Sequence, residues 1–135
     1  MAITFTIPGE PVPQPRPRVS TRGGFARAYV PAKHPVHAYR DAIADAARAA
    51  GAGVHGDPVS VAIDFVASRP KSHLRKSGLK ADAPALPRFD IDNATKAVLD
   101  SLNGVAWEDD SQVARLVVEK SYGTEARTTV RISDG

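Results

Sequence analysis

Prolines occupy every second position from residue 11 to residue 17, in the segment PGEPVPQPRPR, and they constrain the fold more than any other feature. Each proline fixes its own φ and lacks an amide hydrogen, and it also restricts the residue before it. We therefore expect an extended arm of polyproline type that cannot join a central sheet. Arg16 and Arg18 project from this arm, which acts either as a rigid connector or as a contact to phosphate groups.

The segments on either side of the arm have periodic patterns. Residues 3–7 (ITFTI) alternate as a strand does, and Pro8-Gly9 ends the strand. Residues 20–30 are typical of a flexible turn followed by a short strand. Residues 35–50 predict a helix, with a proline in its first turn, an apolar stripe along one side and glycines after its end.

The second half of the chain predicts three more strands and a second helix. Alternation over residues 59–67 predicts a strand, in which Asp64 lies opposite the larger residues and is either exposed or a ligand. A helix is expected over residues 93–102, and strands over 116–121 and 127–132. We predict a single α/β (α+β) domain over residues 1–135, a mixed sheet with two main helices packed against it.

Composition excludes several classes of protein. The chain has no cysteine, which excludes disulfides, thiolate zinc sites and cysteine nucleophiles. Its four histidines lack metal-binding spacing, so we expect no histidine metal site. No segment has the roughly 20 apolar residues of a membrane helix, and the N-terminus reaches Gly and Pro too early for a signal peptide. We expect a cytoplasmic protein that does not enter membranes.

The net charge of +3 results from strongly segregated segments. Residues 1–40 contain six Lys and Arg against one acid, and residues 68–88 also contain six against one. Residues 89–110 reverse the balance, with six acids against one lysine. Such a pattern suits a polyanion that meets bound cations, although the basic segments are equally consistent with solvated loops. The stretch 68–87 lacks periodicity, and a loop of this length is usually functional or disordered.

The acidic segment opens with Asp90 and Asp92, separated by one residue. If residues 89–92 are extended, the two carboxylates lie on one side, roughly 6.6 Å apart, and can share a cation. Phe89 and Ile91 would then anchor the segment in the core. Alternatively Asp92 is the N-cap of the helix, although capping does not explain Asp90.

Two further groups of polar residues follow. Lys96 lies one helical turn after Asp92 and four residues before Asp100, so it forms either a surface ion pair or a contact to whatever binds at Asp92. Glu108, Asp109 and Asp110 are adjacent carboxylates that repel one another unless they are solvated or share a cation. Together with the first pair they are hard oxygen ligands suited to Mg²⁺ or Mn²⁺.

The segment DIDNATKAVLDSLNGVAWEDDSQV resembles the RusA family of Holliday junction resolvases, with its signature D-x-D-N-x-x-K, a helix, and W/Y-x-D-D-x-Q. The match runs from Asp90 to Gln112, and IPGEPVPQPRPR and AYR (residues 38–40) are also similar to that family. The basic stretch 68–88 is longer than in compact members of the family.

The resemblance implies an α/β homodimer that cuts four-way DNA junctions with Mg²⁺, with Mn²⁺ as a substitute, in a phage or prophage setting. It implies metal ligands at Asp90, Asp92 and Asp110, with Asp109 as the alternative to Asp110, and a catalytic lysine at Lys96. Asn93 and Asp109 are expected to support these ligands. We expect basic side chains on both flanks to bind phosphates of the junction arms: Arg16, Arg18, Lys71, Arg75, Lys76 and Arg88.

Two other functions compete with junction cleavage. A non-catalytic junction-binding protein would keep the basic surface, but its unneutralised carboxylates would oppose binding to a polyanion. A Mg²⁺-dependent nucleotide hydrolase would need a phosphate-binding loop, and this sequence has no glycine-rich loop of that kind.

Overall fold

The alternating strand patterns form one four-stranded sheet in the computed structural model, which describes residues 2–135. The strand order is β1-β8-β4-β7, with β1 at Ala2–Pro8, β8 at Arg127–Asp134, β4 at Val59–Ser68 and β7 at Val113–Gly123. β8 lies antiparallel to both of its neighbours, whereas β4 and β7 are parallel. The sheet is therefore mixed, as predicted, and all four expected sheet strands are confirmed.

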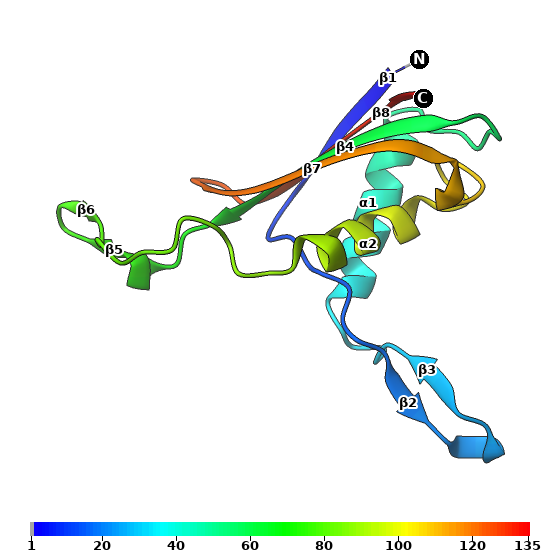
Figure 1. Ribbon diagram of the computed structural model, residues 1–135, viewed down its shortest axis with the longest axis horizontal. Coiled ribbons are helices and arrows are strands. Elements are labelled where there is room, and N and C mark those ends of the chain that lie inside the picture. Colours follow the sequence, from blue (N-terminus) through cyan, green and yellow to red (C-terminus); the bar gives the residue numbers. More distant parts are fainter. Residues whose placement is uncertain (1) are drawn as a thin grey trace.

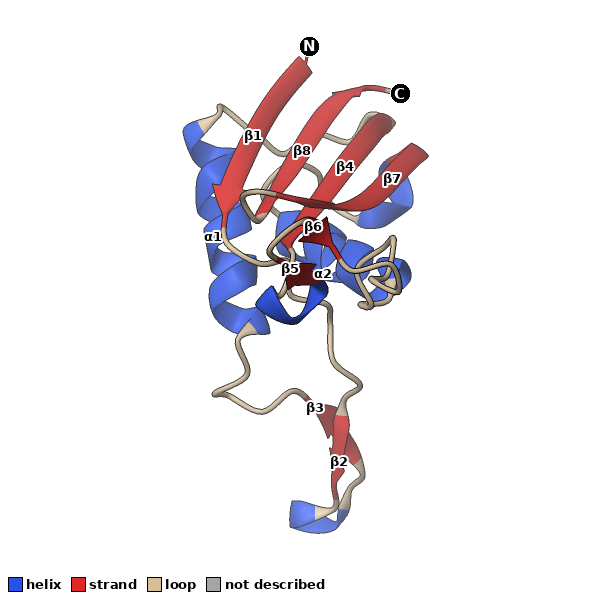
Figure 2. Cartoon of the chain, turned by 90° about the vertical axis from the view of Figure 1, so that its left-hand side faces the viewer, coloured by secondary structure: helices blue, strands red, loops and turns tan. Residues whose placement is uncertain are grey.

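Two helices, α1 (Val36–Ala49) and α2 (Ile91–Leu102), pack on one face of this sheet and against each other (Figure 2). α2 lies in the connection between β4 and β7, because parallel neighbours need a crossover that returns the chain to the same end of the sheet. Gly51 and Gly104 follow the two helices at φ of 94° and 76°, a backbone conformation that favours glycine. In residues 2–135, neither helix is long and apolar enough to cross a membrane.

The core lies between the sheet and the helices. The alternate residues of β4 that were predicted to face inward are buried, and they meet Tyr39 and Ile43 of α1 and Val98 and Leu102 of α2. Trp107 is fully buried, and its indole Nε1 donates a hydrogen bond to Oδ1 of Asn103 at 2.7 Å. This bond fastens the end of α2 to the chain that leads into β7.

Two arms extend away from the sheet (Figure 1): the first arm is the chain between β1 and α1 (residues 9–35), and the second arm is the chain between β4 and α2 (residues 69–90). In the first, β2 (Arg18–Ser20) and β3 (Arg27–Tyr29) pair around a short turn, so the predicted turn and strand are a complete hairpin. The second contains a 3-10 turn at Lys71–His73 and a small hairpin of β5 (Leu74–Arg75) and β6 (Gly78–Leu79). The proline segment between β1 and β2 joins no strand, as predicted.

The start of α2 differs from the expectation. The helix begins at Ile91, so Asp92 lies within its first turn and Asp90 occupies the N-cap position with an extended backbone, φ −70° and ψ 125°. The predicted extended segment over residues 89–92 is therefore wrong, as is the N-cap at Asp92. Phe89 does pack edge-on against Phe65, but Ile91 is 36% exposed and does not anchor the segment.

Candidate active site

A surface groove of about 480 Å³ separates α2 from the edge strand β7. Three of the four residues predicted to be catalytic line this groove: Asp92, Lys96 and Asp110. Its other lining residues are mainly apolar and come from both sides: Ile91, Thr95 and Leu99 from α2, and Leu116 and Val118 from β7. The fold thus brings carboxylates from two distant motifs to one hollow.

The sequence of α2 explains why these side chains face outward. Residues 94, 97, 98, 101 and 102 are buried, and they occupy one face of a helix with 3.6 residues per turn. Asp92 and Lys96 are one turn apart on a different face and are exposed. Thr95 lies beside them, and its hydroxyl donates to the Ile91 carbonyl at 2.7 Å. Burial of the apolar face therefore fixes the orientation of the polar one.

Asp90 is exposed at the N-terminus of α2 and is not among the residues that line the groove. Its Oδ2 accepts a hydrogen bond from Nδ2 of Asn93 at 3.2 Å. Oδ1 of Asp92 accepts from the backbone amide of Asn93 at 2.9 Å. Asn93 therefore contacts both carboxylates of the pair, once through its side chain and once through its backbone.

The oxygen atoms of Asp90, Asp92 and Asp110 are suitable ligands for a hard cation, but the three side chains do not form a complete metal site. Among residues 2–135, no three His, Asp or Glu side chains lie together closely enough to hold a metal ion. Because Asp90 and Asp92 are two positions apart at a helix start, their side chains diverge, whereas on a strand they would have been parallel. Asp92 and Asp110 share the groove, and Asp90 would have to rotate to join them.

Lys96 forms an ion pair with Asp100 one turn further along α2, with Nζ 3.3 Å from Oδ2. The lysine side chain is 62% exposed, so solvent screens this interaction and leaves it weak. Both interpretations of Lys96 are thus compatible with its position, since it is paired with Asp100 and also lines the groove beside Asp92.

Asp109 and Asp110 have different surroundings. Asp109 caps the 3-10 turn Asp110–Gln112: its Oδ2 accepts from the Ser111 amide at 3.0 Å, and the hydrogen bonds to Ser111 lower the pKa of Asp109. Gln112 completes the arrangement, because its Oε1 accepts from the backbone amides of Glu108 and Asp109. The Asp109 carboxylate therefore caps the turn. Of the two adjacent aspartates, Asp110 is the one that lines the groove.

Gln112 also anchors the turn to the rest of the fold. Its Nε2 donates to the carbonyls of His55 and Asp57 at 2.7 and 2.9 Å, in the loop before β4. The final glutamine of the W-x-D-D-x-Q motif therefore holds the position of Asp110 relative to the sheet.

Sequence reasoning missed two residues next to the site. Lys120 of β7 donates from Nζ to the carbonyls of Pro87 and Phe89 at 2.9 and 2.8 Å, which fixes the backbone just before Asp90. The sequence pattern did indicate the orientation of Lys120. It follows Leu116 and Val118 in the alternation of the strand and therefore faces the helices. Gln14, in the proline arm, donates its backbone amide to the Asn93 carbonyl at 2.9 Å, and its buried Oε1 has no hydrogen-bond partner among residues 2–135.

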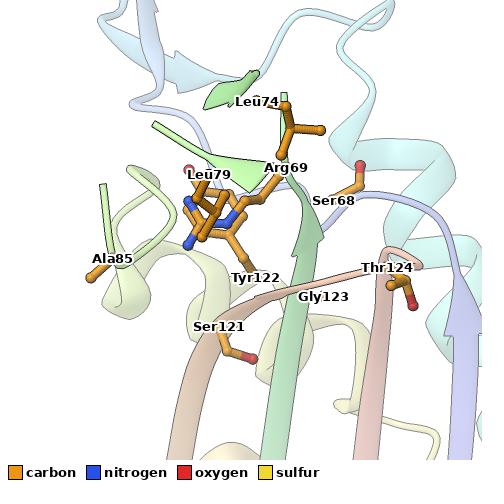
Figure 3. A pocket seen from close by; sticks show the side chains of 9 residues that line it. All are labelled: Ser68, Arg69, Leu74, Leu79, Ala85, Ser121, Tyr122, Gly123 and Thr124. Atoms are coloured by element: carbon orange, nitrogen blue, oxygen red, sulfur yellow. The ribbon is translucent and has the colours of Figure 1, made fainter. Parts of the chain in front are cut away.

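The predicted DNA-binding residues are all exposed and lie on the two arms or near their bases: Arg16, Arg18, Lys71, Arg75, Lys76 and Arg88. Arg69 is different. Its guanidinium lies over the Tyr122 ring, 4.3 Å from the centroid (Figure 3). It also donates a hydrogen bond to the Pro84 carbonyl at 2.7 Å. These contacts fold the second arm back onto the end of β7. They border a largely apolar pocket of about 590 Å³ whose lining includes Leu74 and Leu79.

Comparison with known proteins gives two matches over nearly the whole chain. The family model described as "Endodeoxyribonuclease RusA" matches residues 8–133. The protein YqaN of Bacillus subtilis (strain 168), described as uncharacterized, is 36% identical over 137 residues, covering 98% of this chain and 96% of YqaN.

Proposed function

The chain belongs to the RusA endodeoxyribonuclease family, and from this premise we propose that it is a Mg²⁺-dependent nuclease that resolves four-way DNA junctions. The observation that best supports this is the groove between α2 and β7, where Asp92, Lys96 and Asp110 meet although the motifs that supply them are separated by a helix. Carboxylates that can hold a divalent cation, beside a lysine, can supply the positive charge that assists hydrolysis of a phosphodiester.

In the proposed site, Asp92 and Asp110 would hold a Mg²⁺ ion, and Asp90 would join them if its exposed side chain rotated. When bound, the ion supplies a Lewis acid for the phosphate and lowers the pKa of a water molecule. Mn²⁺ has similar ligand preferences and is the expected substitute. Asn93 would keep Asp92 in place through its backbone amide, and its side chain would release Asp90 when that carboxylate rotates.

Lys96 supplies positive charge to the scissile phosphate. Its ion pair with Asp100 is exposed and weak, so exchanging this partner for a phosphate costs little. Placed one turn from Asp92, its ammonium group can offset the negative charge that builds up in the transition state. We therefore expect loss of Lys96 to reduce the rate of cleavage more than the affinity for DNA.

The two arms provide the surface that holds the junction. They extend in different directions from the body, with α2 between them in Figure 1, and they carry the six exposed Lys and Arg side chains identified above. Contacts of this kind bind phosphates without reading the base sequence. We propose that the protein acts as a homodimer, so that two sites related by two-fold symmetry nick opposite strands of the junction.

The decisive experiment incubates a labelled four-way junction, beside a linear duplex of the same sequence, with Mg²⁺ or with EDTA. The wild type should nick the junction in paired positions only with Mg²⁺ and leave the duplex intact. Asp92→Asn and Asp110→Asn should lower the rate on the order of 100-fold, because each removes a ligand of the cation that would stabilise the negatively charged transition state. Both variants should still bind the junction.

Asp109→Asn is the matched control. Asparagine is as good a helix cap as aspartate, so this variant should keep its fold and its cleavage rate. The assignment of the ligands fails if Asp90→Asn cleaves at the full wild-type rate in saturating Mg²⁺.

One observation favours a second function, the non-catalytic binding of junctions. Among residues 2–135, the carboxylates of Asp90, Asp92 and Asp110 do not lie close enough together to form a metal site. This second function predicts tight, salt-sensitive binding of the junction and no nicking at any Mg²⁺ concentration. The same assay therefore separates the two functions.

A further inference from the structure

A pocket of about 590 Å³ lies between the second arm and the end of β7 (Figure 3). Leu74 and Leu79 line it, although they are 46% and 49% exposed. The two leucines are directly opposite each other in the β5–β6 hairpin, so their side chains lie on the same face of the hairpin. An apolar hollow of this size, surrounded by charged residues, is typical of a ligand-binding site.

Two planar side chains meet in this pocket. The Arg69 guanidinium lies over the face of the Tyr122 ring, and its hydrogen bond to the Pro84 carbonyl holds it there. The ring also meets His73 edge-on, with 5.7 Å between the ring centroids and 87° between the planes. Both planar groups are thus held in place by contacts within the chain, which lowers the entropy that a ligand loses them on binding.

The chemistry of the pocket and its surroundings suits an unpaired nucleobase. Aromatic rings and guanidinium planes are the groups on which proteins stack such bases. The strand that carries the base would find basic side chains for its phosphates, because Lys71, Arg75 and Lys76 are exposed on the same arm. Among residues 2–135 none of these three forms an ion pair within the chain. An apolar peptide would also fit the leucines, but it would not use this excess of positive charge.

We propose that the pocket binds one unpaired base of the DNA, stacked against Arg69 and Tyr122, while the basic residues of the second arm hold the adjacent phosphates. This inference rests on the proposed junction cleavage and names the part of the substrate that the second arm recognises. A paired base within a duplex cannot enter the pocket, and extruding a base costs least where it is already unpaired. Because the stack of bases is interrupted at the crossover of a four-way junction, the pocket favours junctions over linear duplex.

The pocket and the candidate site lie along the same strand. Val118 lines the groove beside α2, and Tyr122 is four residues further along β7, so both side chains are on the same face of the strand. At 3.3 Å per residue the two positions are roughly 13 Å apart, or about four nucleotide steps of 3.4 Å along a duplex strand. A base held in the pocket would therefore place a phosphate a few nucleotides away near the groove.

The test measures binding in EDTA, so that neither metal nor cleavage enters it. The two probes are a short oligothymidylate and an abasic oligonucleotide of the same length, which has the same phosphates but no bases. The wild type should bind the oligothymidylate about tenfold more tightly, since stacking of one base strengthens binding by about this factor. Equal affinity of the wild type for the two probes would overturn the proposal.

Variants of Tyr122 assign this preference to the pocket. Tyr122→Leu keeps an apolar side chain but removes the ring, and it should lose most of the preference, whereas Tyr122→Phe should retain it. Arg75→Gln should weaken the binding of both probes by the same factor, because it removes a phosphate contact alone. Phe25→Leu, at a 70% exposed position of the first arm, is the control for an aromatic residue outside the pocket and should keep the preference. An undiminished preference in Tyr122→Leu would refute the site.

A photochemical cross-link locates the base without altering the protein. An oligothymidylate in which 5-iodouracil replaces one thymine should, on irradiation, become linked to the wild type at or near Tyr122. Linkage confined to the first arm would contradict the proposal. A protein that nicks junctions but shows no preference for bases would refute the pocket alone, and one that shows the preference but never nicks would refute the nuclease function alone.

Discussion

At the scale of single residues, adjacent side chains in the acidic motifs have different structural roles. Asp109 accepts hydrogen bonds that cap the 3-10 turn, and Gln112 ties that turn to the loop before β4. This leaves Asp110 facing the groove, where Asp92 also lies. The W-x-D-D-x-Q motif is therefore mostly a support that positions one carboxylate.

Lys120 is a positioning residue for the other carboxylates, because its ammonium group holds the carbonyls of Pro87 and Phe89 just before Asp90. Lys120→Met should leave these two carbonyls without their donor and loosen the start of α2. We expect cleavage to fall about tenfold and the Mg²⁺ concentration for half-maximal rate to rise, as for other residues that support metal ligands. Lys120→Arg, which keeps the charge and donors, should recover much of the loss.

Lys80→Met is the control, because it also removes one lysine but at an exposed position of the second arm. A Mg²⁺ dependence that is unchanged in Lys120→Met would show that Lys120 contributes only to stability.

At the scale of elements, a buried hydrogen bond joins α1 to β8. The Tyr39 hydroxyl and Thr128 Oγ1 are 2.5 Å apart, and both residues are buried. Burial raises the pKa of Tyr39 to about 12, while the hydrogen bond to Thr128 partly opposes this shift. The bond fixes how the helix lies on the sheet.

Tyr39→Phe should lower the free energy of unfolding by about 1 kcal/mol, because the Thr128 hydroxyl is left buried without its partner. The wild type should also lose stability as the pH rises from about 10 to about 12, because the unfolded chain releases the tyrosine proton before the folded one does. Tyr39→Phe should not show the part of the stability loss at alkaline pH that comes from the ionisation of Tyr39. Urea unfolding at neutral and alkaline pH measures both effects, with exposed Tyr29→Phe as the control; equal alkaline losses in Tyr39→Phe and wild type would contradict this explanation.

At the scale of the whole molecule, charge is separated between extended arms and the body. Both arms are basic, whereas the acids gather around α2 and the turn before β7. A polyanion can thus be held at two places while its scissile bond approaches carboxylates that would repel it without a cation.

Junction binding should therefore depend steeply on salt, and the first arm should contribute a measurable share. Arg16→Gln with Arg18→Gln should reduce the slope of log affinity against log salt by about two if each arginine contacts one phosphate. Arg48→Gln is the control, because Arg48 lies on α1 and is paired with Asp45 at 3.3 Å. An unchanged slope in the double variant would exclude the arm from the DNA contact.

The sequence by itself determined the sheet strands, both helices and the exclusion of the proline segment from the sheet, because these follow from local periodicity and backbone restriction. Through the family resemblance of its motifs, it also identified three of the residues that line the groove: Asp92, Lys96 and Asp110. It did not determine the start of α2: an aspartate is equally favourable as a cap or in the first turn, and only packing of Ala94 and Val98 against the sheet decides which residue enters the helix.

Only the tertiary structure decided which residues act together. The crossover through α2 brings Asp92 and Asp110 to the same groove, and the inward register of β7 sends Lys120 to the backbone before Asp90. Neither contact is visible in a linear pattern, since each joins segments that are adjacent only after the sheet has formed. The position of β7 at the edge of the sheet formed by residues 2–135 is likewise a property of the strand order and not of the strand's own residues.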